Sequence, residues 1–274
     1  MKLRAHLPHA VVLFALGATA CNKPAAVETR PAAPAAKEAN SPVADAKAAA
    51  APAPQAAPGT KASVSNTNVL IFRNVRSWRR KVDFEEALTE LGYKFDVKPS
   101  AEMANTDLSP YAFVIIPGAQ WRDDFYHQYA DNADRFDRYV TNGGTLVLEL
   151  NGAERDGITL PGGAKMVGHG ATDNALALPT HPILNPLSGK PIHANYASHG
   201  YLEAVPKDAL VLATEMDASQ PLPDKPTFVE YSHGAGRVIA ACQCFHDQDG
   251  SGRGILMETT ISYAAEKQWF SPQK

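Results

Sequence analysis

Two cysteines, a histidine and two aspartates lie close together near the C-terminal end of the chain, in the stretch CQCFHDQDGSGRG that begins at Cys242. Cys242, Cys244 and His246 alternate along the sequence, so a strand would carry all three side chains on one face. Thiolate and imidazole groups are ligands that suit zinc or copper. The structural alternative is a buried strand, because cysteine is among the most buried residue types and packs like a small apolar side chain.

The same stretch has the ligand spacing of a calcium-binding loop. Counted from Asp247, oxygen-bearing side chains fall at the first, third, fifth and twelfth positions, namely Asp247, Asp249, Ser251 and Glu258. Against calcium, Gly254 stands at the eighth position, which is usually aliphatic, and a strand leads into the loop where a calcium hand has a helix. Acidic, glycine-rich turns also begin helices, where an aspartate caps the free amides. Calcium and zinc are therefore both possible cofactors, and neither is required.

Histidines from the middle of the chain could join this stretch. His181 or His199 could approach His246 and two carboxylates, Glu149 and Glu154. A cluster of histidine and carboxylate side chains can bind a metal or perform acid–base chemistry near neutral pH. The alternative is that the middle histidines are turn residues whose polar groups are satisfied by the local backbone.

A basic loop with an aromatic residue, VRSWRRK, follows the first apolar segment. Its arginines, Arg76, Arg79 and Arg80, could hold an anion, although exposed arginines on loops are commonly only solvated. Trp78 in this loop, or Trp121 after a later apolar segment, could stack on a sugar ring. The glycine-rich LPGGAKMVGHG lacks the spacing and the Lys-Ser/Thr ending of a phosphate loop.

Alternating strands and helices are expected to position these groups. Apolar runs predict strands at 68–74, 94–99, 111–119, 145–150 and 209–216, and two more strands around a turn at 233–236. Helical spacing predicts helices at 82–93, 132–144 and about 253–267. Continuous apolar strands between helices favour a mostly parallel sheet that is covered on both faces. Residues 151–206 are rich in Gly, Pro, His and Asn and are expected to form an irregular insert.

The order of three motifs resembles a known family. The run FVIIPGA, the helix RFDRYVTNGG before TLVLEL, and HGAGRVIA before a final helix are similar to the class I glutamine amidotransferase-like superfamily. The resemblance covers most of residues 67–267. It implies a flavodoxin-like three-layer α/β sandwich, and in active members a Cys-His-Glu triad that hydrolyses glutamine.

This chain departs from the family's triad at two positions. Where active members have the nucleophilic cysteine, the sequence reads LELNGAE, with Leu150 and Asn151. His246 matches the family's histidine, and Gln248 stands where the glutamate is expected. A neutral amide does not stabilise an imidazolium as a carboxylate does, and no thiol is present at the elbow to be activated. The resemblance is therefore closer to the non-catalytic or trehalose-utilisation-type branch, and glutaminase activity is not expected.

The first residues are typical of a secretory signal peptide. Lys2 and Arg4 precede the apolar run 10–18, which is too short to span a bilayer. Cys21 then stands where a bacterial lipoprotein carries its lipid, although Ala18 replaces the usual leucine three positions earlier. We expect a lipoprotein signal over 1–21 and an anchor at Cys21, facing the periplasm or the cell surface. A soluble secreted protein is the alternative.

Composition divides the rest of the chain into a tether and one domain. Residues 22–66 are dominated by Ala and Pro and contain no aromatic residue, Leu or Ile, so we expect a disordered linker before a domain at 67–270. The net charge is -3, and no basic stripe with aromatic residues is present, which argues against nucleic acid as a partner. Cys242 and Cys244 are too close along a strand to form a disulfide easily.

These observations predict an envelope-anchored binding or scaffolding module. Ligands of parallel sheets bind beyond the carboxyl ends of the strands. The expected ligand-binding residues are Trp78, Trp121, Asn151, Glu154 and His199. The alternative is a hydrolase or isomerase that acts on a carbohydrate-like substrate through His246 and Asp247, with or without a metal. Such an enzyme needs a base that faces a closed pocket within hydrogen-bond reach of a carboxylate or a metal.

Overall fold

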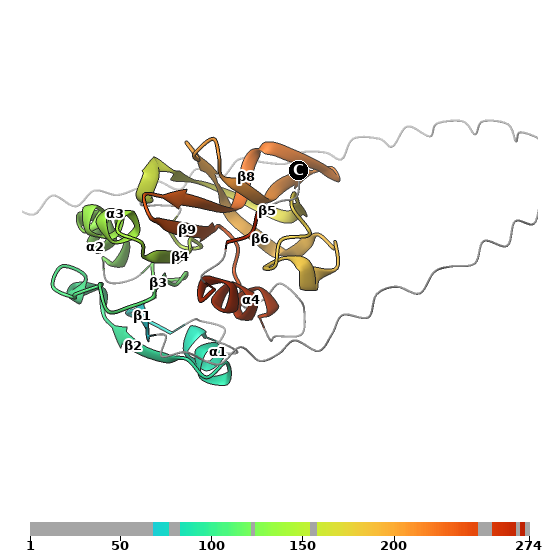
Figure 1. Ribbon diagram of the computed structural model, residues 1–274. Coiled ribbons are helices and arrows are strands. Elements are labelled where there is room, and N and C mark those ends of the chain that lie inside the picture. Colours follow the sequence, from blue (N-terminus) through green and yellow to red (C-terminus); the bar gives the residue numbers. More distant parts are fainter. Residues whose placement is uncertain are drawn as a thin grey trace, which may run out of the picture. The chain divides into compact units, whose positions relative to one another are not determined.

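The chain forms one large mixed sheet with α-helices against it, as the computed structural model shows (Figure 1). The structure describes residues 68–76, 83–121, 124–153, 158–245, 254–266 and 269–271. These residues belong to one compact unit, Pro58–Lys274. Within them the strand order is β2-β1-β3-β4-β9-β8-β7-β5-β6. The prediction of an α/β fold is confirmed at this level.

The first five strands in this order are parallel to one another. They are β2 (Lys94–Lys98), β1 (Asn68–Phe72), β3 (Phe113–Ile116), β4 (Thr145–Glu149) and β9 (Gly236–Ala241). Every residue of β3, β4 and β9 is buried. Their continuous apolar runs therefore fit a sheet that is covered on both faces, as the sequence predicted.

The other four strands are antiparallel. They are β8 (Gln220–His233), β7 (Leu210–Asp217), β5 (Lys165–Leu176) and β6 (Ile192–Glu203). The predicted turn at 233–236 joins β8 to β9. Among the described residues, four of the eight strand pairings are parallel and four are antiparallel, so the expectation of a mostly parallel sheet is wrong.

The expectation of an irregular insert at 151–206 is also wrong for most of this segment, because β5 and β6 pair over most of their length. The ladder changes register between Gly168 and Ala171 and again between Ala171 and Asp173. These irregularities shift the side-chain alternation. Much of β5 is also exposed or half-buried, so few apolar residues mark it as a strand.

Helices lie on both faces of the parallel half. They are α1 (Phe84–Glu90), α2 (Phe125–Asp131), α3 (Ala133–Thr141) and α4 (Ile255–Ala264). Phe136 of α3 packs in one apolar cluster with Leu70, and Leu88 of α1 packs in the other with Ile71. The two clusters lie on opposite faces of β1, because successive strand residues point to opposite faces. In the described part of the chain, no helix is long and apolar enough to cross a bilayer.

A polar network is buried between β8, β9 and α4. Glu230 accepts hydrogen bonds from the Tyr263 hydroxyl at 3.0 Å and from Arg237 Nη1 at 3.4 Å, and its Oε2 lies 2.8 Å from His181 Nε2. The Ile183 amide donates to His181 Nδ1. Nδ1 is therefore a hydrogen-bond acceptor. The proton of His181 is then on Nε2, which donates a hydrogen bond to Glu230. The network joins the segment before β6 to the last helix.

The strand β6 also approaches the carboxyl end of β9. It lies close to β8 as well as to its ladder partner β5. The His199 amide donates to the Cys242 carbonyl at 2.9 Å. The antiparallel half of the sheet therefore curls back and brings a β6 histidine to the end of a parallel strand.

Candidate functional site

The candidate site lies at the carboxyl ends of β1, β3, β4 and β9. A buried glutamine, Gln120, joins two of these ends. Its Oε1 accepts from the amides of Asn74 at 2.9 Å and Val75 at 3.1 Å, and its Nε2 donates to the Val75 carbonyl. The segments after β1 and β3 are therefore fixed to each other.

Glu149, the last residue of β4, is buried at the centre of this edge. Its Oε2 accepts from the Gly118 amide at 3.0 Å, and its Oε1 accepts from the Phe245 amide at 2.8 Å. Burial raises the pKa of the carboxyl to about 7, because the loss of solvent outweighs the two amide donors. Glu149 therefore fixes the segments that follow β3 and β9, and its carboxyl group titrates near neutral pH.

Asn151 closes the space above Gly118. A Cβ atom at Gly118 would lie 1.5 Å from Asn151 Oδ1, so only glycine fits beneath this side chain. The Asn151 carbonyl accepts from the Ala119 amide at 2.6 Å. The amides of Gly118 and Ala119 are thus both bonded within the protein. An anionic intermediate at this edge would need such donors to be available.

The hollow at this point is small. Gly118, Glu149, Arg73 and Glu85 line it, and its volume is about 20 Å³ as far as the described residues define it. That is room for roughly one water molecule. Arg73 forms ion pairs here with Asp83, at 3.5 Å, and with Glu85.

A larger and open hollow lies beyond the ends of β1 and β2. Its volume is about 510 Å³, and Asn74, Ser100, Lys98 and Gln128 are among its lining residues. Asn74 and Ser100 bond to each other twice, through Asn74 Nδ2 to Ser100 Oγ at 2.7 Å and the Ser100 amide to Asn74 Oδ1 at 2.8 Å. The rim of this hollow is therefore well ordered and polar.

Trp121 stands at the same edge, directly after the β3 exit loop. The side chain is 51% exposed. A Cβ atom at Gly152 would lie 3.2 Å from Trp121 Cε3, so the indole covers the turn after β4. The expected position of Trp121 at the strand ends agrees with the structure, and its exposed ring offers a surface for stacking.

The two cysteines of the C-terminal stretch have different environments. The strand β9 ends at Ala241, and Cys242 lies fully buried in the apolar cluster of Leu70. Cys244 is half-buried, and its Sγ lies 3.6 Å from His199 Nε2. The strand therefore stops before the cysteines, and the premise that it carries both on one face with His246 is wrong. His246 lies outside the described residues, so zinc binding stays a prediction.

His199 and His181 have separate positions. The His199 amide bonds to the Cys242 carbonyl just after β9, so His199 lies at the carboxyl edge as expected, and the exposed ring of Tyr196 lies 5.4 Å from the His199 ring. His181 is fully buried and is bonded to Glu230. The idea that His181 joins the carboxyl edge is therefore wrong. It is also held by the local backbone, through the Ile183 amide.

Several predicted site residues lie outside the described residues: Trp78, Glu154, His246, Asp247, Asp249 and Ser251. Glu258 is described. It lies in the first turn of α4, beside an open hollow that Leu91, Pro182 and Tyr263 also line. Because the other proposed calcium ligands are not described, the calcium loop stays a prediction.

Three carboxylates that the sequence did not single out form an acidic cluster at the start of α1. Ligand oxygens of Asp83, Glu85 and Glu86 lie within 4.8 Å of one another. Arg73 is paired with two of them, and Glu86 accepts from the Asp83 amide as half of a capping box. Charge pairing and helix capping account for this cluster.

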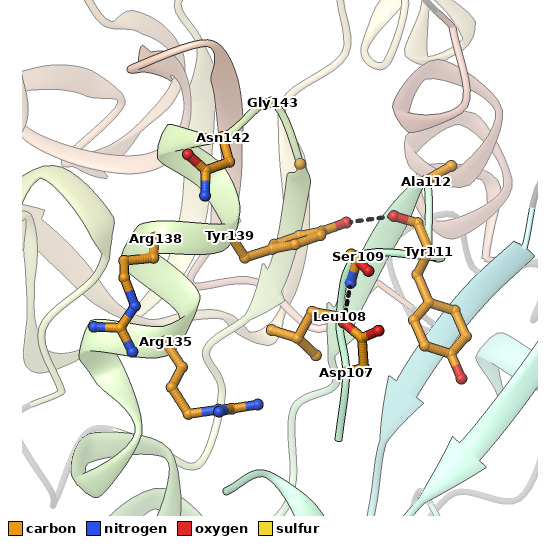
Figure 2. A pocket seen from close by; sticks show the side chains of 11 residues that line it. Asp107, Leu108, Ser109, Tyr111, Ala112, Arg135, Arg138, Tyr139, Asn142 and Gly143 are labelled. Carbon is orange, nitrogen blue, oxygen red and sulfur yellow. Dashed lines mark hydrogen bonds between the residues drawn. The ribbon is translucent and has the colours of Figure 1, made fainter. Parts of the chain in front are cut away.

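Another hollow, of about 400 Å³, lies at the opposite edge of the sheet, before β3 and β4. Figure 2 shows α3 on one side and the segment 107–112 on the other, with the Tyr139 hydroxyl donating to the Tyr111 carbonyl at 3.0 Å. Arg135 donates to the Thr106 carbonyl at 2.6 Å, beside the hollow. This hollow lies at the amino ends of the parallel strands, away from Glu149 and Asn151.

Sequence reasoning named Glu149 and His199 but missed the contacts that they make at the carboxyl edge. The contact between Cys244 and His199 joins residues 45 positions apart and has no local signal. Glu149 did have a local signal in the sequence. It is the only charged residue in the apolar run TLVLEL, and a charge at the end of a buried strand needs a partner. Its two amide partners come from other strands and could not be read from the sequence.

Comparison with known proteins gives one curated relative. No family model matches the chain. An uncharacterised protein of Clostridium acetobutylicum is 22% identical over 204 residues, which are 73% of this chain and 20% of that protein. The chain therefore spans about a fifth of the length of the curated relative that it matches.

Among solved structures, the chain is similar to three proteins at low identity. A candidate GMP synthase component from Thermoplasma acidophilum has a TM-score of 0.46 at 16% identity, over 73% of this chain and 96% of that one. A cytoplasmic protein of Salmonella typhimurium has a TM-score of 0.44 at 16%, over 72% and 98%. A β-galactosidase of Bacillus circulans sp. alkalophilus has 0.45 at 17%, over 73% and 31%. These TM-scores are too low to assign the chain to any of these groups.

Proposed function

We propose that this chain is a non-catalytic binding module with a glutamine amidotransferase-like, flavodoxin-like fold. The order β2-β1-β3-β4-β9, parallel throughout and with helices on both faces, supports the fold. The main support for the lack of catalysis is Asn151. It stands where the resemblance puts the nucleophile, and it covers Gly118.

The neighbouring groups support the same conclusion. Glu149 occupies the Gly118 amide, and the Asn151 carbonyl occupies the Ala119 amide. An acyl-transfer site needs such donors aimed at the developing oxyanion. A hollow of about 20 Å³ also leaves no room for a glutamine side chain.

The ligand is carbohydrate-like and binds outside this closed corner. The strand order reverses at β1, which has β2 on one side and β3 on the other. Ligands of open α/β sheets bind at such a switch point. Trp121 offers an exposed ring at this edge of the sheet, and the polar hollow around Asn74 and Ser100 lies at the same edge. A sugar presents an apolar face to an aromatic ring and hydroxyls to polar side chains.

The module acts at the cell envelope, held by a lipid on Cys21 through the Ala- and Pro-rich segment 22–66. The signal-like start of the chain and the position of Cys21 support this location. Segment 22–66 lies outside the described residues, and its proposed role as a tether would let the domain reach ligands away from the membrane.

Titration calorimetry of the full chain with manno-, gluco- and galacto-oligosaccharides tests the binding function. Trp121→Ala is expected to weaken binding of a panel member by about fivefold or more, because aromatic stacking contributes about 1 kcal/mol or more. Trp269→Phe is the matched control. Trp269 is 40% exposed, but it lies against Arg237 and not at the carboxyl edge.

Parallel assays separate the alternatives. Ammonia release from glutamine would overturn the non-catalytic proposal. Turnover of an oligosaccharide would favour the hydrolase alternative, in which His246 and Asp247 act. Failure of every sugar to bind, with the chain folded, would reject the carbohydrate-like ligand.

A further inference from the structure

The contact between Cys244 and His199 is a thiol–imidazole pair that the proposed ligand binding does not use. Cys244 Sγ and His199 Nε2 are 3.6 Å apart, within hydrogen-bond range for sulfur. His199 is held at its backbone and at its ring. Its backbone amide donates to the Cys242 carbonyl at 2.9 Å, and the Tyr196 ring lies against it. The pair is therefore fixed by the curl of β6 towards β9.

A thiol attacks electrophiles as the thiolate, so a base within hydrogen-bond reach increases its reactivity. With the proton of His199 on Nδ1, Nε2 can accept the proton of the Cys244 thiol. The carboxylate of Glu149 accepts a hydrogen bond at 2.8 Å from the amide of Phe245, the residue after Cys244. That bond holds the backbone of the thiol-bearing segment.

The two cysteines differ in access. Cys242 is fully buried among apolar side chains, while Cys244 is half-buried and paired with the imidazole. A small electrophile can reach a half-buried thiol, and a fully buried thiol in an apolar cluster is inert. Cys242 therefore provides an internal comparison two residues away.

We propose that Cys244 is a nucleophilic thiol activated by His199 and a modification site for small electrophiles, with hydrogen peroxide as the physiological class. This goes beyond the proposed binding function and does not depend on it, because the modification consumes the thiol once and is not turnover.

In the reaction with peroxide, the thiol–imidazole pair supplies both the nucleophile and the base. His199 Nε2 takes the thiol proton, and the sulfur attacks one peroxide oxygen. The S–O bond forms as the O–O bond breaks, and the leaving hydroxide takes the proton from the imidazolium and departs as water. Sulfur is oxidised to the sulfenic acid and peroxide is reduced.

Site-resolved alkylation of the folded full chain tests the proposal. Iodoacetamide is added at pH 7 in the presence of a chelator, and the modification of each cysteine peptide is followed by mass spectrometry. Cys244 is expected to react at least about tenfold faster than Cys242. His199→Gln is expected to slow Cys244 by about tenfold or more, because a positioned base is lost. His193→Gln, on the same strand but paired with Asp173, is the matched control and should leave the rate unchanged.

The outcomes are distinct. Trapping of a peroxide-dependent sulfenic acid at Cys244 with dimedone, lost in His199→Gln, would support the proposal. Equal rates for Cys244 and Cys242 in the native chain would overturn it, whatever the variants do. Faster reaction of both cysteines in His199→Gln would mean that the imidazole only keeps the segment closed, and would also overturn it.

Discussion

Glu149 is a buried carboxyl whose charge state should control stability near neutral pH. Its pKa in the folded protein is about 7, against an ordinary value of 4.5. The folded state therefore binds the proton more tightly than the unfolded state. The stability from this group is complete below about pH 4.5 and is lost as the pH rises to about 7, by roughly 3 kcal/mol in all.

Glu149→Gln should remove this pH dependence, because the amide stays neutral. Urea unfolding of wild type and variant at pH 4.5, 6 and 8 measures the effect. The difference in free energy of unfolding is expected to move in favour of the variant by roughly 3 kcal/mol between the lowest and highest pH. Glu90→Gln, at an exposed position of α1, is the control. A constant difference across this range would show that folding does not raise the pKa of Glu149.

At the scale of single residues, the sequence indicated where a residue lies in the sheet better than what its side chain contacts. Trp121 and His199 were expected at the carboxyl ends of the strands, and both lie there. Asn151 was expected to bind a ligand, yet its side chain lies over Gly118 and is almost fully buried. Spacing along the chain gives the strand end on which a residue lies. It does not give which neighbouring backbone the side chain will cover.

At the scale of elements, the network around Glu230 joins β8, β9 and α4. Glu230→Gln should destabilise the fold by about 3–5 kcal/mol, because it leaves the fully buried Arg237 without its carboxylate. The double variant Glu230→Gln with Arg237→Met should cost less than the sum of the two single changes. Urea unfolding of the single and double variants measures both values.

A surface pair provides the comparison for this network. Lys98 and Glu102 form an exposed ion pair at 3.1 Å, and Glu102→Gln should change stability by no more than about 1 kcal/mol. If Glu230→Gln were as mild as Glu102→Gln, the buried network would contribute no more than a solvated pair.

The predictability of each element followed the continuity of its apolar run. β1, β3 and β4 were predicted because every residue but Asn68 is buried, which leaves an uninterrupted hydrophobic segment. The helix α2 was missed, although Phe125, Tyr126 and Tyr129 are buried. It has only seven residues, and Asn132 both ends it and begins α3, so the sequence offers no separate boundary. The strands β5 and β6 were missed because bulges break their alternation.

At the scale of the whole molecule, the proposed tether and lipid anchor make a separate prediction. Cys21→Ser should release the chain from the membrane fraction, because the thiol that would carry the lipid is absent. Cell fractionation with metabolic labelling by a fatty acid measures this. Cys244→Ser is the matched control and should stay in the membrane fraction. Equal recovery of wild type and Cys21→Ser in the soluble fraction would favour the secreted alternative.

The sequence predicted the parallel half of the sheet and left the antiparallel half incomplete. The parallel strands β1, β3 and β4 depend on local apolar runs, which the sequence reveals. The junction of the halves depends on a curl that brings His199 to Cys242, across 43 positions (242 − 199). Such long-range contacts set the candidate site, so the edge could be located from the sequence but its chemistry could not.

The position of β9 has a consequence for how the chain acquires its structure. This strand lies between β4 and β8 in the middle of the sheet, yet it is the last strand of the described chain. Its ladder with β4 pairs Thr145 with Arg237, so the sheet interior closes only after most of the polypeptide has been synthesised. Until then β4 presents an unpaired edge, which is the kind of surface on which nascent chains associate wrongly. Folding should therefore be slow and dominated by this late, non-local pairing.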